Sequence, residues 1–212
     1  MGRLDLFIIL ALIFNCIFEI SGHGMVMNPV GRGSRWKVDL TAPVNYDDNG
    51  SNCGGFSNQW SSQGGKCGVC GDPYQATTPR MHELGGLLGV SGVVVATYNK
   101  GSTIEVTVRL TANHLGKFVF DICNLDAEGE TDECFSRYTL QTIEGKNEYA
   151  IGSAVGDYKV LLKLPTNLTC QHCVLRWTYT AGNNWGWCGD GTGRLGCGPQ
   201  ETFRTCSDVK IA

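Results

Sequence analysis

The sequence predicts an all-β protein, an antiparallel β-sandwich with long disulfide-stapled loops, on three observations. Glycine accounts for 29 of the 212 residues and only 17% are charged, which is typical of loop-rich β-proteins rather than helical ones. Short segments with the two-residue period of strands follow residue 92. An even number of cysteines remains once an N-terminal leader is set aside, as in exported disulfide proteins.

The leader is residues 1–22, which have the features of a secretory signal peptide. Arg3 gives the positive start, residues 6–14 form the apolar core, and Ser21-Gly22 supplies small residues before a cut. The apolar run is too short and wrongly flanked to span a membrane. Cleavage after Gly22 would make His23 the first mature residue, whereas cleavage a residue or two away would leave it an ordinary terminal side chain. We expect a secreted, extracellular protein with one domain, residues 23–212.

The charge balance excludes several classes of partner. The formal net charge is −3 and the pI is near 5.8, so neither nucleic acid nor an anionic membrane is an expected partner. We also expect a monomer.

The chain contains 11 cysteines, of which Cys16 lies in the leader and would leave with it. The other ten predict a disulfide framework, and the closest local pairs are Cys123–Cys134 and Cys188–Cys197, each enclosing a short turn-like segment. Residues 67–70 and 170–173 have a C-x2-C spacing that also suits zinc. Disulfides are the better interpretation, because the two motifs lie too far apart for a zinc ribbon and the compartment is oxidising.

Residues 23–80 are rich in Gly, Asn, Ser, Asp and Pro, which predicts long disulfide-stapled loops with one short helix. Several aromatic residues are scattered through this stretch, and one or two exposed on a flat face would suit stacking on sugar rings: Trp36, Tyr46, Phe56, Trp60 and Tyr74. Strands are expected at 93–98, 103–110, 117–122, 158–164 and 174–179. Asn49-Gly50-Ser51 and Asn167-Leu168-Thr169 are N-glycosylation acceptors and fit export.

Chemistry concentrates on two histidines. His114 follows the alternating strand, where a loop begins and a side chain can reach a surface metal. A single histidine there is more often structural. A mature N-terminal His23 changes that balance, because its amine, its ring and the His114 ring offer three nitrogens, a donor set that suits Cu(II).

Gln200-Glu201-Thr202-Phe203 completes this predicted copper site. On a strand, Glu201 and Phe203 point the same way. Phe203 would then cap an axial position without binding the metal, and Glu201 would hydrogen-bond an oxygen species beside it. The alternative is that Phe203 is simply a core residue.

Other motifs carry no predicted catalysis. His82-Glu83 lacks the second histidine of a zinc hydrolase helix, and His172 lies between two cysteines. There is no Gly-x-Ser-x-Gly elbow, and no pair of acids is placed for glycoside hydrolysis.

These residues closely resemble the animal lytic polysaccharide monooxygenases, auxiliary activity family fifteen, whose catalytic domain is also known as a type-4 chitin-binding domain. The resemblance covers essentially the whole mature chain. It rests on blocks that occur in order: His23-Gly24, Pro43-Val44-Asn45-Tyr46, Cys53-Gly54-Gly55-Phe56, Cys67-Gly68-Val69-Cys70-Gly71-Asp72, Thr111-Ala112-Asn113-His114, Trp177-Thr178-Tyr179, Gly182-Asn183-Asn184-Trp185-Gly186, Gly196-Cys197-Gly198 and Gln200-Glu201-Thr202-Phe203-Arg204.

The resemblance implies an immunoglobulin-like sandwich that presents one copper ion on a flat surface. His23 and His114 would match the family's histidine brace, and Ala112 the small residue that shapes the axial side. Phe203 falls where some members carry tyrosine. The implied reaction is oxidative cleavage of β-1,4 bonds in crystalline chitin, or in cellulose, with an external electron donor and dioxygen or hydrogen peroxide.

Two other functions compete with this one. A non-catalytic chitin-binding or cuticle protein would keep the fold but would not need His23, His114, Glu201 and Phe203 together. A copper-storage protein would ask for more soft ligands than Met25, Met27 and Met81 provide.

Overall fold

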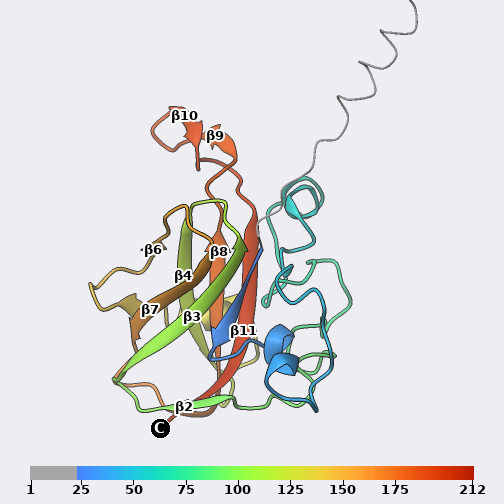
Figure 1. Ribbon diagram of the computed structural model, residues 1–212, viewed down its shortest axis with the longest axis vertical. Coiled ribbons are helices and arrows are strands. Elements are labelled where there is room, and N and C mark those ends of the chain that lie inside the picture. Colours follow the sequence, from blue (N-terminus) through green and yellow to red (C-terminus); the bar gives the residue numbers. More distant parts are fainter. Residues whose placement is uncertain (1–22) are drawn as a thin grey trace, which may run out of the picture.

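Two β-sheets enclose one apolar core in residues 23–212, which are the residues that the computed structural model describes (Figure 1). The expected signal peptide, residues 1–22, lies outside the described residues. One of these two sheets has the order β1-β3-β7-β5 and the other has the order β2-β11-β8-β4-β6, while β9 and β10 form a separate two-stranded sheet. No helix within residues 23–212 has the length and apolarity needed to cross a bilayer.

The strands are β1 (His23–Asn28), β2 (Ala96–Tyr98), β3 (Thr103–Ala112), β4 (Lys117–Asn124), β5 (Gln141–Thr142), β6 (Tyr149–Ala150), β7 (Gly156–Lys163), β8 (Cys170–Thr180), β9 (Trp185–Trp187), β10 (Gly193–Leu195) and β11 (Thr202–Ile211). The helices are short: η2 (Arg32–Lys37) is a 3-10 helix, η3 (Asn58–Ser62) is a π-helix and α2 (Asp132–Ser136) is an α-helix.

The strand periodicity of β3 places its apolar side chains in the core. Ile104, Val106, Val108 and Leu110 are all buried, whereas Glu105 and Arg109 between them are exposed. This alternation is what a half-buried strand requires, because successive side chains point to opposite faces. The expected strands at 103–110, 117–122, 158–164 and 174–179 are therefore confirmed as β3, β4, β7 and β8.

The edge strand β2 is shorter than the strand that was expected there. The predicted strand 93–98 begins only at Ala96, and Val93 and Val94 stay partly exposed. β2 pairs with β11 in the parallel direction, while the other strand pairs of the sheets are antiparallel. β-branched composition alone does not distinguish a paired edge strand from an extended loop, since the partner decides it.

Five disulfides connect the ten cysteines of the described chain: Cys53–Cys67, Cys70–Cys206, Cys123–Cys134, Cys170–Cys173 and Cys188–Cys197. The two local pairs expected from sequence are confirmed. The C-x2-C at 67–70 is not a disulfide, because Cys67 bonds to Cys53 and Cys70 crosses to β11. With every sulfur bonded, neither C-x2-C motif has a thiolate for zinc.

The irregular layer of residues 29–95 packs beside β1 and β11 and contains two short helices, one more than expected (Figure 1). Arg32 in η2 is 4% exposed and makes two hydrogen bonds to Asp208 on β11, of 2.8 and 2.6 Å. Together with Cys70–Cys206, which closes a loop of 136 residues, this ion pair ties the layer to the sandwich.

Candidate functional site

His23 is the first residue of β1 and lies opposite Ala112 at the end of β3. Gly24 lets the strand come this close to its neighbours, since a Cβ there would lie 2.6 Å from Leu110 Cδ2. The Gly24 amide donates to the Asn49 carbonyl at 3.0 Å, which holds the strand from its other side. The start of the described chain is therefore fixed by backbone pairing and packing.

His114 lies two residues beyond the end of β3 and is 8% exposed, so it is buried rather than on the surface as the sequence suggested. Its backbone amide donates to the Tyr179 hydroxyl at 2.9 Å, and that hydroxyl donates to the Leu115 carbonyl at 2.8 Å. Gly182 donates to the His114 carbonyl at 2.9 Å. Three contacts thus position the residue that carries the imidazole.

Glu201 comes immediately before β11, and its Oε2 is 3.5 Å from His114 Nδ1. This is an ion-pair distance and too long for a good hydrogen bond. His114 Nδ1 is buried and has no hydrogen-bond partner among residues 23–212. Asn52 donates to the Glu201 carboxylate at 3.5 Å. A buried imidazole therefore faces a buried carboxylate that the irregular layer helps to hold.

Phe203, in β11, is fully buried, and its ring centroid lies 6.5 Å from that of His23. On its other side it stacks on Tyr179, with centroids 5.5 Å apart. The two interpretations of Phe203 made from sequence are thus compatible, because it is a core residue that also contacts His23. Glu201 reaches the other histidine, so the segment 201–203 touches both.

Tyr179 is the positioning residue that sequence reasoning did not single out, although it lies within the Trp177-Thr178-Tyr179 block. Burial raises the pKa of Tyr179 to about 12, the nearby Glu201 charge also raises it, and the hydrogen bond from His114 opposes them. The phenol therefore stays protonated at neutral pH and can both donate and accept. Asn52 was also missed, and nothing in its sequence context distinguishes it.

The donor set fits copper. The neutral imidazole is a preferred ligand of Cu(II), and the unpartnered, buried Nδ1 of His114 shows an imidazole that the protein itself does not satisfy. The amine of His23 becomes a third nitrogen only when the chain begins there. Ala112 is half-buried and lies opposite His23 in the strand pairing.

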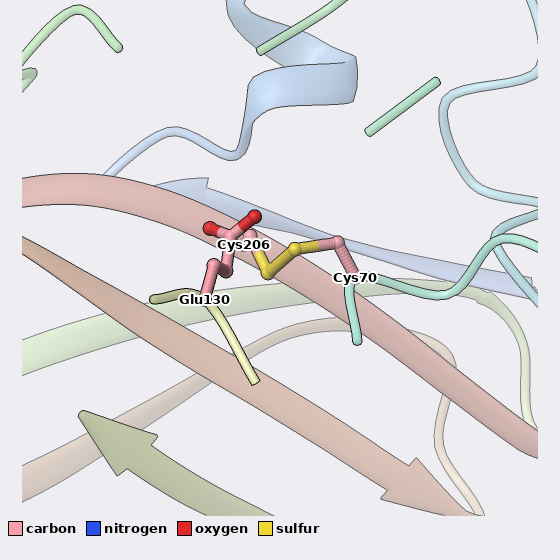
Figure 2. A group of neighbouring side chains, drawn as sticks. All are labelled: Cys70, Glu130 and Cys206. Atoms are coloured by element: carbon pink, nitrogen blue, oxygen red, sulfur yellow. A yellow bond between two sulfur atoms is a disulfide. The ribbon is translucent and has the colours of Figure 1, made fainter. Parts of the chain in front are cut away.

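A second cluster has the ligand types and spacing of a metal site, but its atoms are not available to a metal. Ligand atoms of Cys70, Glu130 and Cys206 lie within 4.8 Å of one another, and no other trio of this kind occurs in residues 23–212 (Figure 2). The two sulfurs are joined to each other, and Glu130 Oε1 is 2.7 Å from Arg32 Nη1. This cluster therefore offers no thiolate, and its carboxylate is already paired.

The other two histidines are held by carboxylates. His82 Nδ1 is 2.8 Å from Asp72, and its Nε2 is 3.5 Å from the Ser51 hydroxyl. His172 Nε2 is 2.7 Å from Asp208. Glu83 pairs with Arg80 at 2.6 Å. These contacts give His82, Glu83 and His172 structural partners.

Comparison with known proteins adds the family. A family described as "Lytic polysaccharide mono-oxygenase, cellulose-degrading" matches residues 23–209. The structure of an AA15 lytic polysaccharide monooxygenase from Thermobia domestica in the Cu(I) state is similar, with 44% identity over 90% of this chain and 99% of that chain, and a TM-score of 0.86.

An AA10 lytic polysaccharide monooxygenase from Streptomyces lividans is also similar, with 14% identity over 89% of this chain and 99% of that chain, and a TM-score of 0.50. At that identity the likeness concerns the fold alone. A search of curated proteins finds no match.

Proposed function

The chain belongs to the lytic polysaccharide monooxygenase family and is a copper-dependent monooxygenase, and from this premise we propose that it oxidatively cleaves β-1,4-linked polysaccharide with one copper ion held by His23 and His114. The observation that carries the assignment of ligands is the position of these two histidines. One begins β1, the other follows the end of β3 which pairs with β1, and Phe203 and Glu201 contact one each.

Copper, when bound, supplies the redox chemistry by which the family oxidises polysaccharide, with electrons from an external donor and with dioxygen or hydrogen peroxide as oxidant. The protein's own part is to hold the nitrogens in place. The backbone of His114 is held by Tyr179 and Gly182, which fixes the position from which its ring extends.

Glu201 is proposed as the residue that hydrogen-bonds the reacting oxygen species. Its carboxylate is largely buried and lies 3.5 Å from His114 Nδ1, so it would lie near a copper ion held by this histidine. Asn52 steadies the carboxylate from the irregular layer. The fully buried ring of Phe203 fills the space beside His23. Removing this ring would lose close packing there.

Chitin is the first proposed substrate, because the resemblance points to a type-4 chitin-binding domain, and cellulose is the second, because the matching family is described as cellulose-degrading. The test is mass spectrometry of soluble products from each polymer, incubated with copper-loaded protein and a reductant. Oxidised oligosaccharides from either polymer are expected. Binding without any oxidised product would instead favour the non-catalytic chitin-binding protein.

The proposal includes export as a monomer and removal of residues 1–22. Edman sequencing of the secreted protein should begin at His23, and any other start would remove the amine from the ligand set. Of the two glycosylation acceptors, Asn167 is the proposed site because it is exposed. The side-chain amide of Asn49 instead donates to Thr111 Oγ1 at 2.9 Å.

A further inference from the structure

A hydroxyl, an imidazole and a carboxylate follow one another within hydrogen-bonding reach in the irregular layer. Ser51 Oγ is 3.5 Å from His82 Nε2, and His82 Nδ1 is 2.8 Å from Asp72 Oδ1. A nucleophile, a base and a group that orients the base are the parts of a serine triad. Such a triad is recognised by its geometry and not by sequence spacing, so no sequence motif indicates it here.

Asp72 orients the His82 ring through two contacts. Its Oδ2 accepts the His82 backbone amide at 3.0 Å, and its Oδ1 accepts from the ring Nδ1. With the proton on Nδ1, the lone pair of Nε2 faces the Ser51 hydroxyl. The 3.5 Å separation is longer than an ideal hydrogen bond, and such nucleophile–base distances shorten when substrate binds. Ser51 is held by its carbonyl, which accepts the Arg204 amide of β11 at 3.0 Å.

The triad borders a cavity of about 300 Å³. Ser51, His82 and Asp72 all line it, and Pro73 and Met81 supply an apolar part of its wall. Ser51 is 8% exposed and the His82 side chain is 12% exposed, so bulk water has limited access to the reacting groups. This volume lies at the small end of ligand pockets, which suits a short acyl group.

A donor for an oxyanion lies in the same cavity. Asn45 lines it, and its Nδ2 is buried with no hydrogen-bond partner among residues 23–212. Its Oδ1 accepts the Asp47 amide at 3.1 Å, which fixes the end of the side-chain amide that carries the protons. Nδ2 and the base face one space, because a Cβ at Gly33 would lie 3.3 Å from Asn45 Nδ2 and 3.2 Å from His82 Nε2. A buried N–H without a partner is available to an oxygen that becomes charged beside it.

The charge of the cavity indicates the class of substrate. Its lining contains two carboxylates, Asp47 and Asp72, and no Lys or Arg. These carboxylates repel an anionic phosphate or sulfate ester, whereas a neutral carboxylic ester is not repelled. The cavity therefore favours an uncharged ester with a short acyl chain.

We propose that Ser51, His82 and Asp72 form a hydrolytic site for short-chain carboxylic esters that is independent of the proposed oxidation of polysaccharide. Ser51 Oγ attacks the carbonyl carbon as its proton passes to His82 Nε2, and Asn45 Nδ2 donates to the oxyanion. The C–O bond to the alcohol breaks, and the alcohol leaves with the proton from His82. Water, deprotonated by His82, then attacks the acyl carbon, which releases the carboxylic acid and restores the Ser51 hydroxyl.

The first test is covalent labelling of the protein with a fluorophosphonate, which reacts with activated serines and loses fluoride. Peptide mass spectrometry should find one adduct, on Ser51. Labelling should disappear in Ser51→Ala and persist in Ser57→Ala, a matched control that removes an exposed hydroxyl of the same layer. Absence of the adduct from Ser51 in the unaltered protein would overturn the proposal, whether or not the Ser51→Ala variant folds.

The second test is hydrolysis of p-nitrophenyl acetate by metal-free protein and by copper-loaded protein without reductant. Equal rates are expected, because copper takes no part. Ser51→Ala and His82→Gln should each lower kcat by about 100-fold or more, the contribution of an activated nucleophile and its base. Asp72→Asn should lower kcat by a similar factor, since the ring then loses its orientation. Asn45→Ala should lower kcat about 100-fold with little change in KM.

His172→Ala is the matched control for the imidazole, because it removes another histidine that an aspartate holds. It should hydrolyse the ester like the unaltered protein, and circular dichroism establishes that each variant keeps the fold. A rate that survives Ser51→Ala, or that appears only with copper, would overturn the proposal. Labelling of Ser51 without turnover of the ester would overturn it as well.

Discussion

Two clusters of metal-capable side chains approach strand β11. The histidine cluster, His23, His114 and Glu201, lies at the start of the strand, and the disulfide cluster, Cys70, Glu130 and Cys206, lies at its middle. Only the disulfide cluster brings three ligand atoms within 4.8 Å of one another in the described chain. Closeness alone would therefore select the disulfide cluster, whose two sulfurs are already bonded to each other.

The two clusters differ in the bonds and contacts that their ligand atoms already make. The sulfurs of the disulfide cluster are bonded to each other, and Arg32 neutralises its carboxylate. Burial raises the pKa of Glu130, and the Arg32 charge only partly offsets it. In the histidine cluster, a buried imidazole nitrogen has no hydrogen-bond partner in the described chain. Glu130 Oε1 likewise has no hydrogen-bond partner in residues 23–212, so the two clusters are distinguished by the bonded sulfurs and by the Arg32 charge that faces Glu130.

The largest effect is expected for His114→Ala, which should abolish copper binding and oxidised products. Because the side chain is buried, the variant should also lose about 1 kcal/mol of unfolding free energy, more than a surface substitution would. Copper titration, product analysis and thermal unfolding measure the three effects. The matched control is His172→Ala, which removes an imidazole paired with Asp208 and should leave copper binding intact. Wild-type product levels from His114→Ala would show that it is not a ligand.

Glu201→Ala should cut turnover severely while copper stays bound, because the carboxylate acts beside the metal. Copper affinity should fall by no more than about 100-fold, the range for residues that orient a ligand. Glu201→Gln, which keeps the shape and a hydrogen-bonding group, should be less impaired. Product yield and copper affinity are measured together, and normal turnover of Glu201→Ala would remove this residue from the mechanism.

Tyr179→Phe tests whether the backbone of His114 needs its partner. The substitution keeps the stacking on Phe203 but leaves the His114 amide and the Leu115 carbonyl without the hydroxyl. A loss of about 1–3 kcal/mol in unfolding free energy is expected, and copper affinity should fall about ten-fold. Unchanged affinity with reduced stability would limit Tyr179 to a purely structural role.

Phe203→Tyr should keep activity and alter the copper spectrum, because a phenol oxygen then approaches the metal from the position of the ring. Phe203→Ala should reduce the unfolding free energy by about 3–5 kcal/mol, since the ring is fully buried. Electron paramagnetic resonance and denaturant unfolding give the two readouts. A spectrum of Phe203→Tyr identical to that of the unaltered protein would place this ring away from copper.

The smallest effect on activity is expected for Glu130→Gln in the disulfide cluster. Copper stoichiometry and product yield should not change. The unfolding free energy should fall by about 1–2 kcal/mol, because Arg32 loses one charged partner but keeps Asp208. Loss of copper in this variant would reverse the distinction between the two clusters.

The fold was predictable where local patterns determine it. The alternation of apolar and polar residues in β3 predicts a strand from adjacent positions alone. The short spacings within Cys123–Cys134 and Cys188–Cys197 likewise predict these disulfides from nearby residues. Cys70–Cys206 joins residues 136 apart, and the parallel pairing of β2 depends on a strand more than a hundred residues later. Such long-range pairings are set by tertiary packing, so the C-x2-C spacing at 67–70 was misleading.

The residues proposed for the site could be identified from the sequence, whereas the residues that hold them in place could not. His23, His114, Glu201 and Phe203 stood out because their chemistry is uncommon at a chain start or beside a strand. The burial of His114 and the positions of Tyr179, Asn52 and Gln200 are set by contacts between distant segments. Trp185 and Trp187 are exposed on the hairpin formed by β9 and β10. The sequence does not distinguish them from core tryptophans, because the packing of the strands determines which side chains are buried.

In the proposed function, a copper ion is held by the amine and ring of His23 together with His114. The most direct measurement is a calorimetric copper titration, with electron paramagnetic resonance, on two proteins: one that begins at His23 and one with a single additional glycine in front of it. We expect one tightly bound Cu(II) with three nitrogen donors in the first protein, and strongly weakened binding with an altered spectrum in the second. Equal affinity and identical spectra in both proteins would contradict it.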